Sequence, residues 1–281
     1  MSQHTSSDVT RQHTSSDVII EKGQILIYRV FDIAEEIQLK KVEDLVQDKS
    51  SSRFSLKRQS RHAVVIKNAP LRVSLGETEL SFGSQNYKAD VTVTIWDYGV
   101  LSVLFQIQIA PGTSWNSLLE QSAYITGDAP VHHFEDLARA KAKEVTTLIA
   151  PALQKPEEWE VYEDYAVYFF EKIGGIQNPR ELVEKVDVPA LILGEPNDTL
   201  SSRTKEPILE NTFQYAASDL AVIDWNAAVV IEPSGLKDIP DVLEFALPHL
   251  MELRYYDDLL DSRLSDLYTS LEGRKTGIFF G

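Results

Sequence analysis

An acidic cluster near the end of the chain, Asp257, Asp258 and Asp261, is the group of residues best suited to chemistry. Asp257 and Asp261 are four residues apart, so on an α-helix they share one face and could bind a divalent cation together. A third ligand would have to come from elsewhere in the chain. In the competing interpretation, Arg254 pairs with Asp258, and Asp257 and Asp261 are solvated or paired across an interface.

Other patterns carry no catalytic signature. The chain has no cysteine, which excludes disulfides, thiolate nucleophiles and cysteine-ligated metals. The H-E-x-x-H, G-x-S-x-G, P-loop and G-x-G-x-x-G patterns do not occur. His132 and His133 are adjacent and would diverge by about 100° on a helix, so they are poorly placed to chelate one ion. No cofactor is predicted beyond a divalent cation at Asp257 and Asp261.

Aromatic residues offer a second candidate site. Four tryptophans and a tyrosine- and phenylalanine-rich run could line a pocket for a small molecule between helices and sheet. These residues are Trp96, Trp115, Trp159 and Trp225 with Tyr162, Tyr165, Tyr168, Phe169 and Phe170. Aromatic residues at strand spacing also form ordinary protein cores, so both interpretations stay open.

A long helix is predicted to position the acidic pair. After a cap at residues 238–241, apolar residues recur in steps of three and four up to Leu271. The stripe is long enough for pairing with another helix, although a helix that covers its own sheet shows the same pattern. The candidate interaction residues are Leu253, Tyr256, Leu260, Leu264, Leu267 and Leu271, together with Phe279 and Phe280 of the apolar tail.

Strands and helices alternate before this helix. The clearest hairpin has an alternating strand at 91–95, a turn at 97–99 and an apolar strand at 100–110. Further strands are expected at 24–30, 71–75, 162–170, 221–225 and 227–231, and helices at 113–125, 131–153 and between 179 and 211. The pattern predicts an α+β fold with antiparallel-rich sheets, helices on one face and a long C-terminal helix.

The turns at 96–98 and 224–226 are alike in composition, which suggests two similar β-α-β-β-α halves. The head contains the sequence QHTSSDV twice and is too polar to form a core. The predicted organisation is a disordered head at 1–20, a first α+β half at 21–155, a second half ending in the long helix at 156–272, and a tail at 273–281.

The net charge disfavours nucleic acid and anionic lipid as partners. The 281 residues include 43 acidic and 27 basic side chains, for a net charge of −16. Such a surface repels nucleic-acid phosphate and anionic lipid.

A secretory signal needs an apolar stretch of roughly 7–15 residues and a membrane span roughly 20, and neither occurs. We therefore expect a cytoplasmic protein with no nucleic-acid partner and no membrane span.

The last helix also carries a family resemblance. Residues 241–246 (DVLEFA) and 250–261 (LMELRYYDDLLD), with the preceding Trp225-Asn226-Ala227-Ala228, resemble the required-for-meiotic-nuclear-division family. The resemblance implies an α+β body, a long C-terminal helical portion and self-association, with no catalytic residues to transfer. In mitochondrial members it implies a membrane-anchored assembly that supports organellar translation, whereas this chain has no spanning segment after the shared helix.

These observations predict a non-catalytic assembly or scaffold module that self-associates or docks a protein partner through its C-terminal helix. The alternative is a divalent-metal-dependent enzyme or metal-binding domain that uses Asp257 and Asp261. A small-molecule sensor built on the aromatic residues is a third hypothesis.

Overall fold

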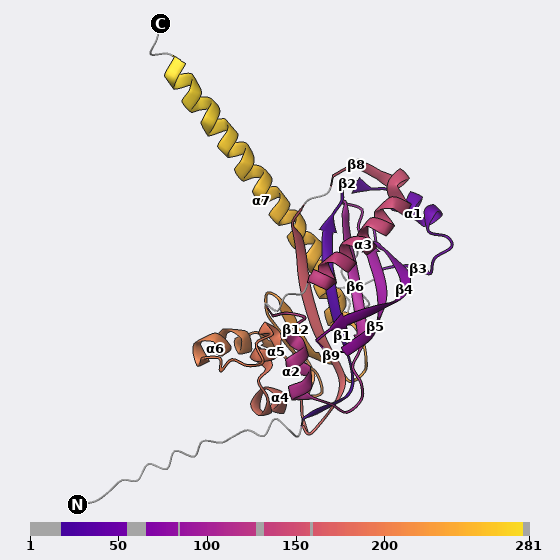
Figure 1. The fold of residues 1–281 in the computed structure, drawn as a ribbon, viewed down its shortest axis with the longest axis vertical. Helices are drawn as coiled ribbons and strands as arrows, with labels where there is room; N and C mark the ends of the chain where they lie inside the picture. Colours follow the sequence, from indigo (N-terminus) through magenta and orange to yellow (C-terminus); the bar gives the residue numbers. More distant parts are fainter. Residues whose placement is uncertain (1–17, 55–65, 84, 128–131, 158–159, 278–281) are drawn as a thin grey trace, which may run out of the picture.

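A large twisted sheet forms the body of the protein, and one long helix projects from it (Figure 1). The structure is a computed structural model, and it describes residues 18–54, 66–83, 85–127, 132–157 and 160–277. Its strands are β1 (Ile19–Asp32), β2 (Ala34–Ile37), β3 (Ser51–Arg53), β4 (Leu71–Phe82), β5 (Gln85–Ile95), β6 (Val100–Gln108), β7 (Thr113–Ser114), β8 (Leu153–Pro156), β9 (Tyr162–Gly174), β10 (Thr212–Phe213), β11 (Leu220–Ile223) and β12 (Ala227–Ile231). Its α-helices are α1 (Leu39–Leu45), α2 (Trp115–Ser122), α3 (His132–Ile149), α4 (Arg180–Lys185), α5 (Val188–Leu193), α6 (Ser202–Glu210) and α7 (Asp238–Gly277).

The strands of the main sheet follow the order β10-β11-β12-β9-β1-β6-β5-β4-β3, with β7 also paired to β1. Neighbouring strands are antiparallel except β12 and β9, which are parallel. A second, two-stranded sheet pairs β2 with β8. The predicted α+β class, the antiparallel-rich sheet and the long C-terminal helix are confirmed.

The predicted hairpin is formed by β5 and β6, whose register runs from Ala89 opposite Ile107 to Ile95 opposite Leu101. The turn between them is closed by a 2.9 Å hydrogen bond from the Trp96 amide to the Val100 carbonyl. The alternating strand and the glycine at position 99 were sufficient to predict this hairpin, because hairpin pairing is local in sequence.

Helices cover both faces of the sheet, which corrects the expectation of one face. The central strand β1 alternates between two cores: Ile25 and Ile27 face α2, α3 and α5, whereas Leu26, Tyr28 and Val30 face the first turns of α7. The unbroken apolar run of β1 is typical of a strand buried on both sides. Because both sets of side chains on β1 are apolar, each face of this strand needs its own covering layer of helices.

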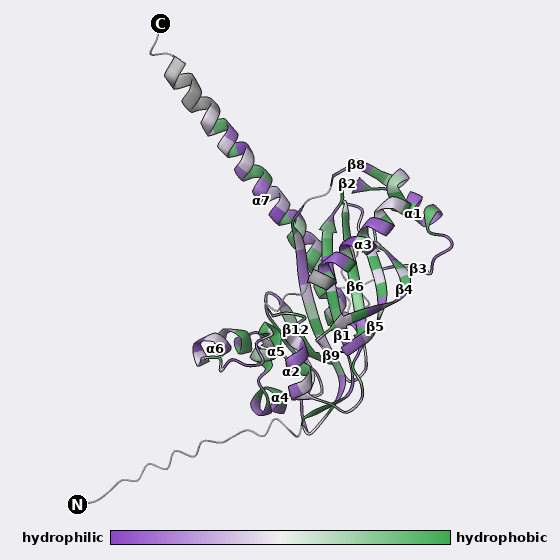
Figure 2. Ribbon diagram, in the orientation of Figure 1, coloured by the Kyte–Doolittle hydropathy of each residue, from purple (hydrophilic) through white to green (hydrophobic). Residues whose placement is uncertain are grey.

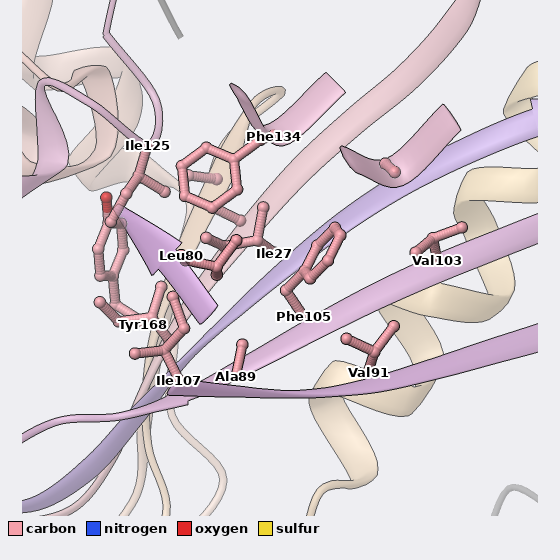
Figure 3. Packing of buried hydrophobic residues seen from close by; sticks show 14 of the residues in the cluster. Ile27, Leu80, Ala89, Val91, Val103, Phe105, Ile107, Ile125, Phe134 and Tyr168 are labelled. Atoms are coloured by element: carbon pink, nitrogen blue, oxygen red, sulfur yellow. The ribbon is translucent and has the colours of Figure 1, made fainter. Parts of the chain in front are cut away.

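Figure 3 shows the larger core, on the face opposite α7. Phe134 of α3 lies over the strands and packs against Phe105 of β6, with 6.3 Å between ring centroids. Ile125, which follows α2, and Tyr168 of β9 lie at one end of this cluster. This core ties both predicted halves of the chain into one unit.

Charged residues fasten the base of α7 to the other face. The side chain of Glu244 is fully buried, and it accepts hydrogen bonds from the Thr94 hydroxyl at 2.5 Å and from the Arg72 guanidinium. Arg72 also binds the Asp241 carboxylate at 2.8 Å and lies over the Phe54 ring, 4.4 Å from its centroid. Burial opposes the charge on Arg72, but Glu244 and Asp241 outweigh it and raise the pKa of the guanidinium. This cluster is the polar anchor of α7.

The two predicted halves fall on opposite sides of the β1–β9 pair. In the first half β6 runs antiparallel to β1, whereas in the second β12 runs parallel to β9. The predicted division of the chain into two halves at 155/156 stays a prediction.

The predicted head and tail differ from the structure at their inner ends. Strand β1 begins at Ile19, with Ile20 buried in the core, and helix α7 continues to Gly277. Residues 1–17 and 278–281 lie outside the described part.

Candidate functional site

Helix α7 changes its surroundings along its length. Near its start Leu243, Leu247 and Met251 pack against the sheet. Arg254, one turn further on, pairs with Glu163 of β9 at 2.8 Å, and beyond this region the helix leaves the body (Figure 1). From Leu260 to Thr269 every residue is exposed. The segment 260–277 would extend roughly 27 Å at 1.5 Å per residue.

The apolar residues that continue along α7 form an outer stripe on a different side of the helix from Leu243, Leu247 and Met251. It comprises Val242, Ala246, Leu250, Leu253, Tyr256, Leu260, Leu264 and Leu267. Its seven large side chains are between 39% and 67% exposed, and Figure 2 shows hydrophobic residues recurring along the projecting part. Steps of three and four residues keep them on one face of the helix.

This arrangement separates two interpretations that the sequence left open. Packing on the protein's own sheet accounts for Leu243, Leu247 and Met251 but not for the predicted interaction residues from Leu253 to Leu267. The side chain of Leu271 and the whole of Phe279 and Phe280 lie outside the described part. The described interaction residues therefore form one exposed apolar surface.

The candidate metal ligands Asp257 and Asp261 are exposed on the projecting part of α7. Within the described ranges, no group of three or more His, Asp or Glu side chains is arranged to hold a metal ion. The structure therefore brings no third ligand to this pair from the residues it describes.

The predicted aromatic pocket is divided between unrelated places. Trp96 and Trp115 are buried in the two cores on opposite faces of the sheet. Trp225 is 78% exposed at the turn between β11 and β12, and Trp159 lies outside the described residues. The tryptophans that are described do not share one pocket.

A cavity of about 310 Å³ lies where α7 leaves the body. Asp32 at the end of β1 and Glu157 after β8 line it from the body, and Glu252 lines it from α7. Tyr98, Tyr255 and Tyr256 supply aromatic walls. We call this space the acidic cavity. Its carboxylates are far apart in sequence, so spacing along the chain could not reveal them.

Burial and mutual repulsion alter the ionisation of this cavity. Burial and the nearby charge of Glu157 raise the pKa of Asp32 to about 6, against the opposing effect of a hydrogen bond from the Ala34 amide. Burial and the charge of Asp32 raise the pKa of Glu252 to about 7. Strongly shifted groups in a cavity are typical of functional sites, although structural networks also produce them.

These raised pKa values predict how stability depends on pH. The ordinary pKa values are 3.8 for Asp32 and 4.5 for Glu252, so the folded protein holds these two protons more tightly than the unfolded chain does. This contribution to the free energy of unfolding is fully present below about pH 4, and it is lost as pH rises through about 6 and about 7. We expect the Asp32→Asn, Glu252→Gln double variant to gain stability relative to the natural chain as pH rises from 5 to 8. Urea unfolding at both pH values measures this change, with the exposed Asp261→Asn as control. A difference in stability that is the same at both pH values would contradict the prediction.

Comparison with known proteins identifies a family. Residues 22–238 match the family described as "Uncharacterized protein MJ0711, N-terminal domain". The match covers well over half of the chain, so the protein belongs to this family. No curated protein and no solved structure matches the chain. The matched segment ends at Asp238, the first residue of α7, so the resemblance at 241–261 to the meiotic-nuclear-division family stays a prediction.

Among the described residues, no helix combines the length and apolar character needed to cross a membrane.

Proposed function

We propose that this protein is a non-catalytic assembly module that pairs with a second copy of itself through the outer stripe of α7. The observation that carries the proposal is the continuous exposure of this stripe from Val242 to Leu267. Contiguous apolar surface of this extent typically marks an interaction site. We also propose a cytoplasmic location for this module.

Helix stability supports a partner on the projecting part of α7. An isolated helix in water is marginal at lengths of about 12–15 residues even for favourable sequences, and most helical stability in proteins comes from packing. Every residue from Leu260 to Thr269 is exposed. A second helix along the outer stripe would supply the missing contacts.

Charge favours a second copy over a strongly charged partner. Residues 253–277 contain four basic and five acidic side chains, so this segment is nearly neutral in a chain of net charge −16. Two such segments would repel each other only weakly, whereas like charges along a helix interface would oppose pairing.

The direction of the stripe also permits pairing. Because the outer stripe lies on a different side of α7 from Leu243, Leu247 and Met251, a second helix can approach without displacing the sheet. The two bodies would then lie on the outside of the helix pair. The polar anchor at Glu244 stays intact in this arrangement.

Light scattering behind size exclusion tests the proposal. We expect the natural chain to have twice the monomer mass of 31.7 kDa and the double variant Leu260→Asp, Leu264→Asp to have the monomer mass. Pairing would bury only the exposed part of each leucine, which contributes about 1 kcal/mol. Losing four leucines from the pair should therefore raise the dissociation constant on the order of 1,000-fold.

Ser262→Asp is the matched control, because Ser262 is exposed on the polar side of the same segment. It adds a charge to α7 without touching the outer stripe, and its mass should equal that of the natural chain. A monomeric natural chain across a wide concentration range, or an unchanged mass in the double leucine variant, would refute self-association through this surface.

A further inference from the structure

A heptad repeat runs along α7, and one of its positions is charged. From residue 250 to residue 271, positions spaced alternately by three and four residues hold leucine with a single exception. These positions, which we call the seam, are Leu250, Leu253, Asp257, Leu260, Leu264, Leu267 and Leu271. Two helices with this spacing pack against each other along their seams. Asp257 is exposed in the single chain, so its carboxylate becomes costly only when a second helix covers the seam.

A charged residue at one seam position restricts how two helices can pair. In a parallel pair without stagger, each seam residue faces the same residue of the second copy, so the two Asp257 carboxylates would oppose each other. Close like charges repel, and the repulsion grows as water is removed. Arg254 lies one turn away, but Glu163 of the body already binds it at 2.8 Å. Parallel pairing therefore leaves both carboxylates at this position without an available cation.

An antiparallel pair accommodates the same residues. In the register that brings the leucines together, the facing residues are Leu250 with Leu267, Leu253 with Leu264, and Asp257 with Leu260. Arg263 follows Leu260 by one helical turn, so its guanidinium can reach Asp257 of the other copy. In the described part of the chain, Arg263 is exposed and has no ion pair of its own. This arrangement supplies an opposite charge to each Asp257.

The charge of the two bodies favours the same arrangement. Residues 253–277 are nearly neutral, so almost all of the net charge of −16 lies on the rest of the chain. A parallel pair places both bodies at one end of the helices, whereas the antiparallel pair moves them toward opposite ends. Repulsion between exposed charges falls off over about 8–10 Å at physiological ionic strength, so this separation weakens it. Val242 is 51% exposed on the docked part of α7, which gives the end of the second helix apolar surface to lie on.

We infer that two copies of α7 pair antiparallel about a two-fold axis between residues 257 and 260, with Asp257 of each copy bound to Arg263 of the other. This inference rests on the proposed self-association and specifies its geometry. Because the axis is two-fold, both ion pairs form together. The charged position of the seam thereby determines both the direction and the register of the helix pair.

Cysteine cross-linking measures the direction of the helices, because the natural chain contains no cysteine. Leu250→Cys and Leu267→Cys are prepared as separate full-length chains, and each is oxidised alone and after mixing in equal amounts. In the antiparallel pair the two copies of residue 250 lie about 25 Å apart along the axis, well beyond the roughly 7 Å between Cα atoms that a disulfide allows. We expect disulfide-linked dimers only in the mixture, whereas a parallel pair gives them in each variant alone.

A charge exchange measures the contribution of the ion pair. Arg263→Asp sets two carboxylates against each other at both sites and should raise the dissociation constant about tenfold. The double variant Asp257→Arg, Arg263→Asp restores opposite charges and should return the dissociation constant to that of the natural chain. In a parallel pair the same double variant sets two arginines against each other and gives no recovery. Ser262→Asp is again the matched control, since it adds a charge outside the seam and should leave the dissociation constant unchanged.

Several results would overturn the inference, and light scattering separates them from a failure of self-association. A natural chain of twice the monomer mass whose Leu250→Cys variant cross-links alone would show parallel helices. A dimer that cross-links in none of the three samples, or that shows no recovery in the double charge variant, would also contradict the antiparallel pair while leaving self-association intact. A monomeric natural chain would refute both the pairing and its geometry.

Discussion

Replacing Arg72 by alanine is expected to destabilise the protein by about 3–5 kcal/mol, the loss typical of breaking a buried ion pair by removing one partner. The reason is the position of Glu244, whose side chain is fully buried and whose carboxylate would keep only the Thr94 hydroxyl as a partner. Asp241 would lose its contact with Arg72 as well. Urea unfolding followed by circular dichroism measures the change in the free energy of unfolding.

Two controls distinguish this effect from a general loss of charge. Lys88→Ala removes a largely exposed pair with Glu77, 3.7 Å apart, and should cost less than about 1 kcal/mol. The double variant Arg72→Met, Glu244→Leu removes both charges of this pair and should recover most of the stability. A loss of under about 1 kcal/mol in Arg72→Ala would show that the polar anchor does not hold α7 on the sheet.

Local patterns explain which elements could be predicted from the sequence. Helix α2 was predicted from the cap at its start, and the Ser114 hydroxyl does accept a 3.2 Å hydrogen bond from the Ser117 amide. The β5–β6 hairpin and α7 also depend on residues close together in sequence. Pairing of β1 with β9 joins residues about 140 positions apart, such as Ile27 with Ala166, and no local spacing encodes that choice of neighbour.

The candidate sites also differ in whether residues close together in the sequence could reveal them. The stripe from Leu253 to Leu267 was visible in the sequence because helical periodicity is local, but only the structure shows that it is exposed. The carboxylates of the acidic cavity come from the end of β1, the segment after β8 and the middle of α7. Their juxtaposition depends on the β2–β8 pairing and on the docking of α7, which are long-range events.

The second substitution with a large expected effect is Gly99→Ala. It tests how closely the β5–β6 turn packs against the segment that contains Ala34. Gly99 has φ of +96°, and a Cβ atom there would lie 1.6 Å from the Ala34 carbonyl oxygen. The same turn accepts a 3.0 Å hydrogen bond from the Ile33 amide at the Gly99 carbonyl. Backbone strain and the forced displacement should together cost about 3–5 kcal/mol of unfolding free energy, measured by urea denaturation.

Gly112→Ala is the matched control, since Gly112 has φ of +88° but nothing within 4 Å of the added atom. It should cost only the strain of a left-handed residue, about 1–2 kcal/mol, so the difference between the two variants isolates the contact with Ala34. Because Ala34 and the neighbouring Tyr98 line the acidic cavity, displacement of the turn in Gly99→Ala should also disturb that cavity. Equal losses in the two glycine variants would mean that the turn moves away from Ala34 without cost, and that the cavity wall beside it is not rigidly held.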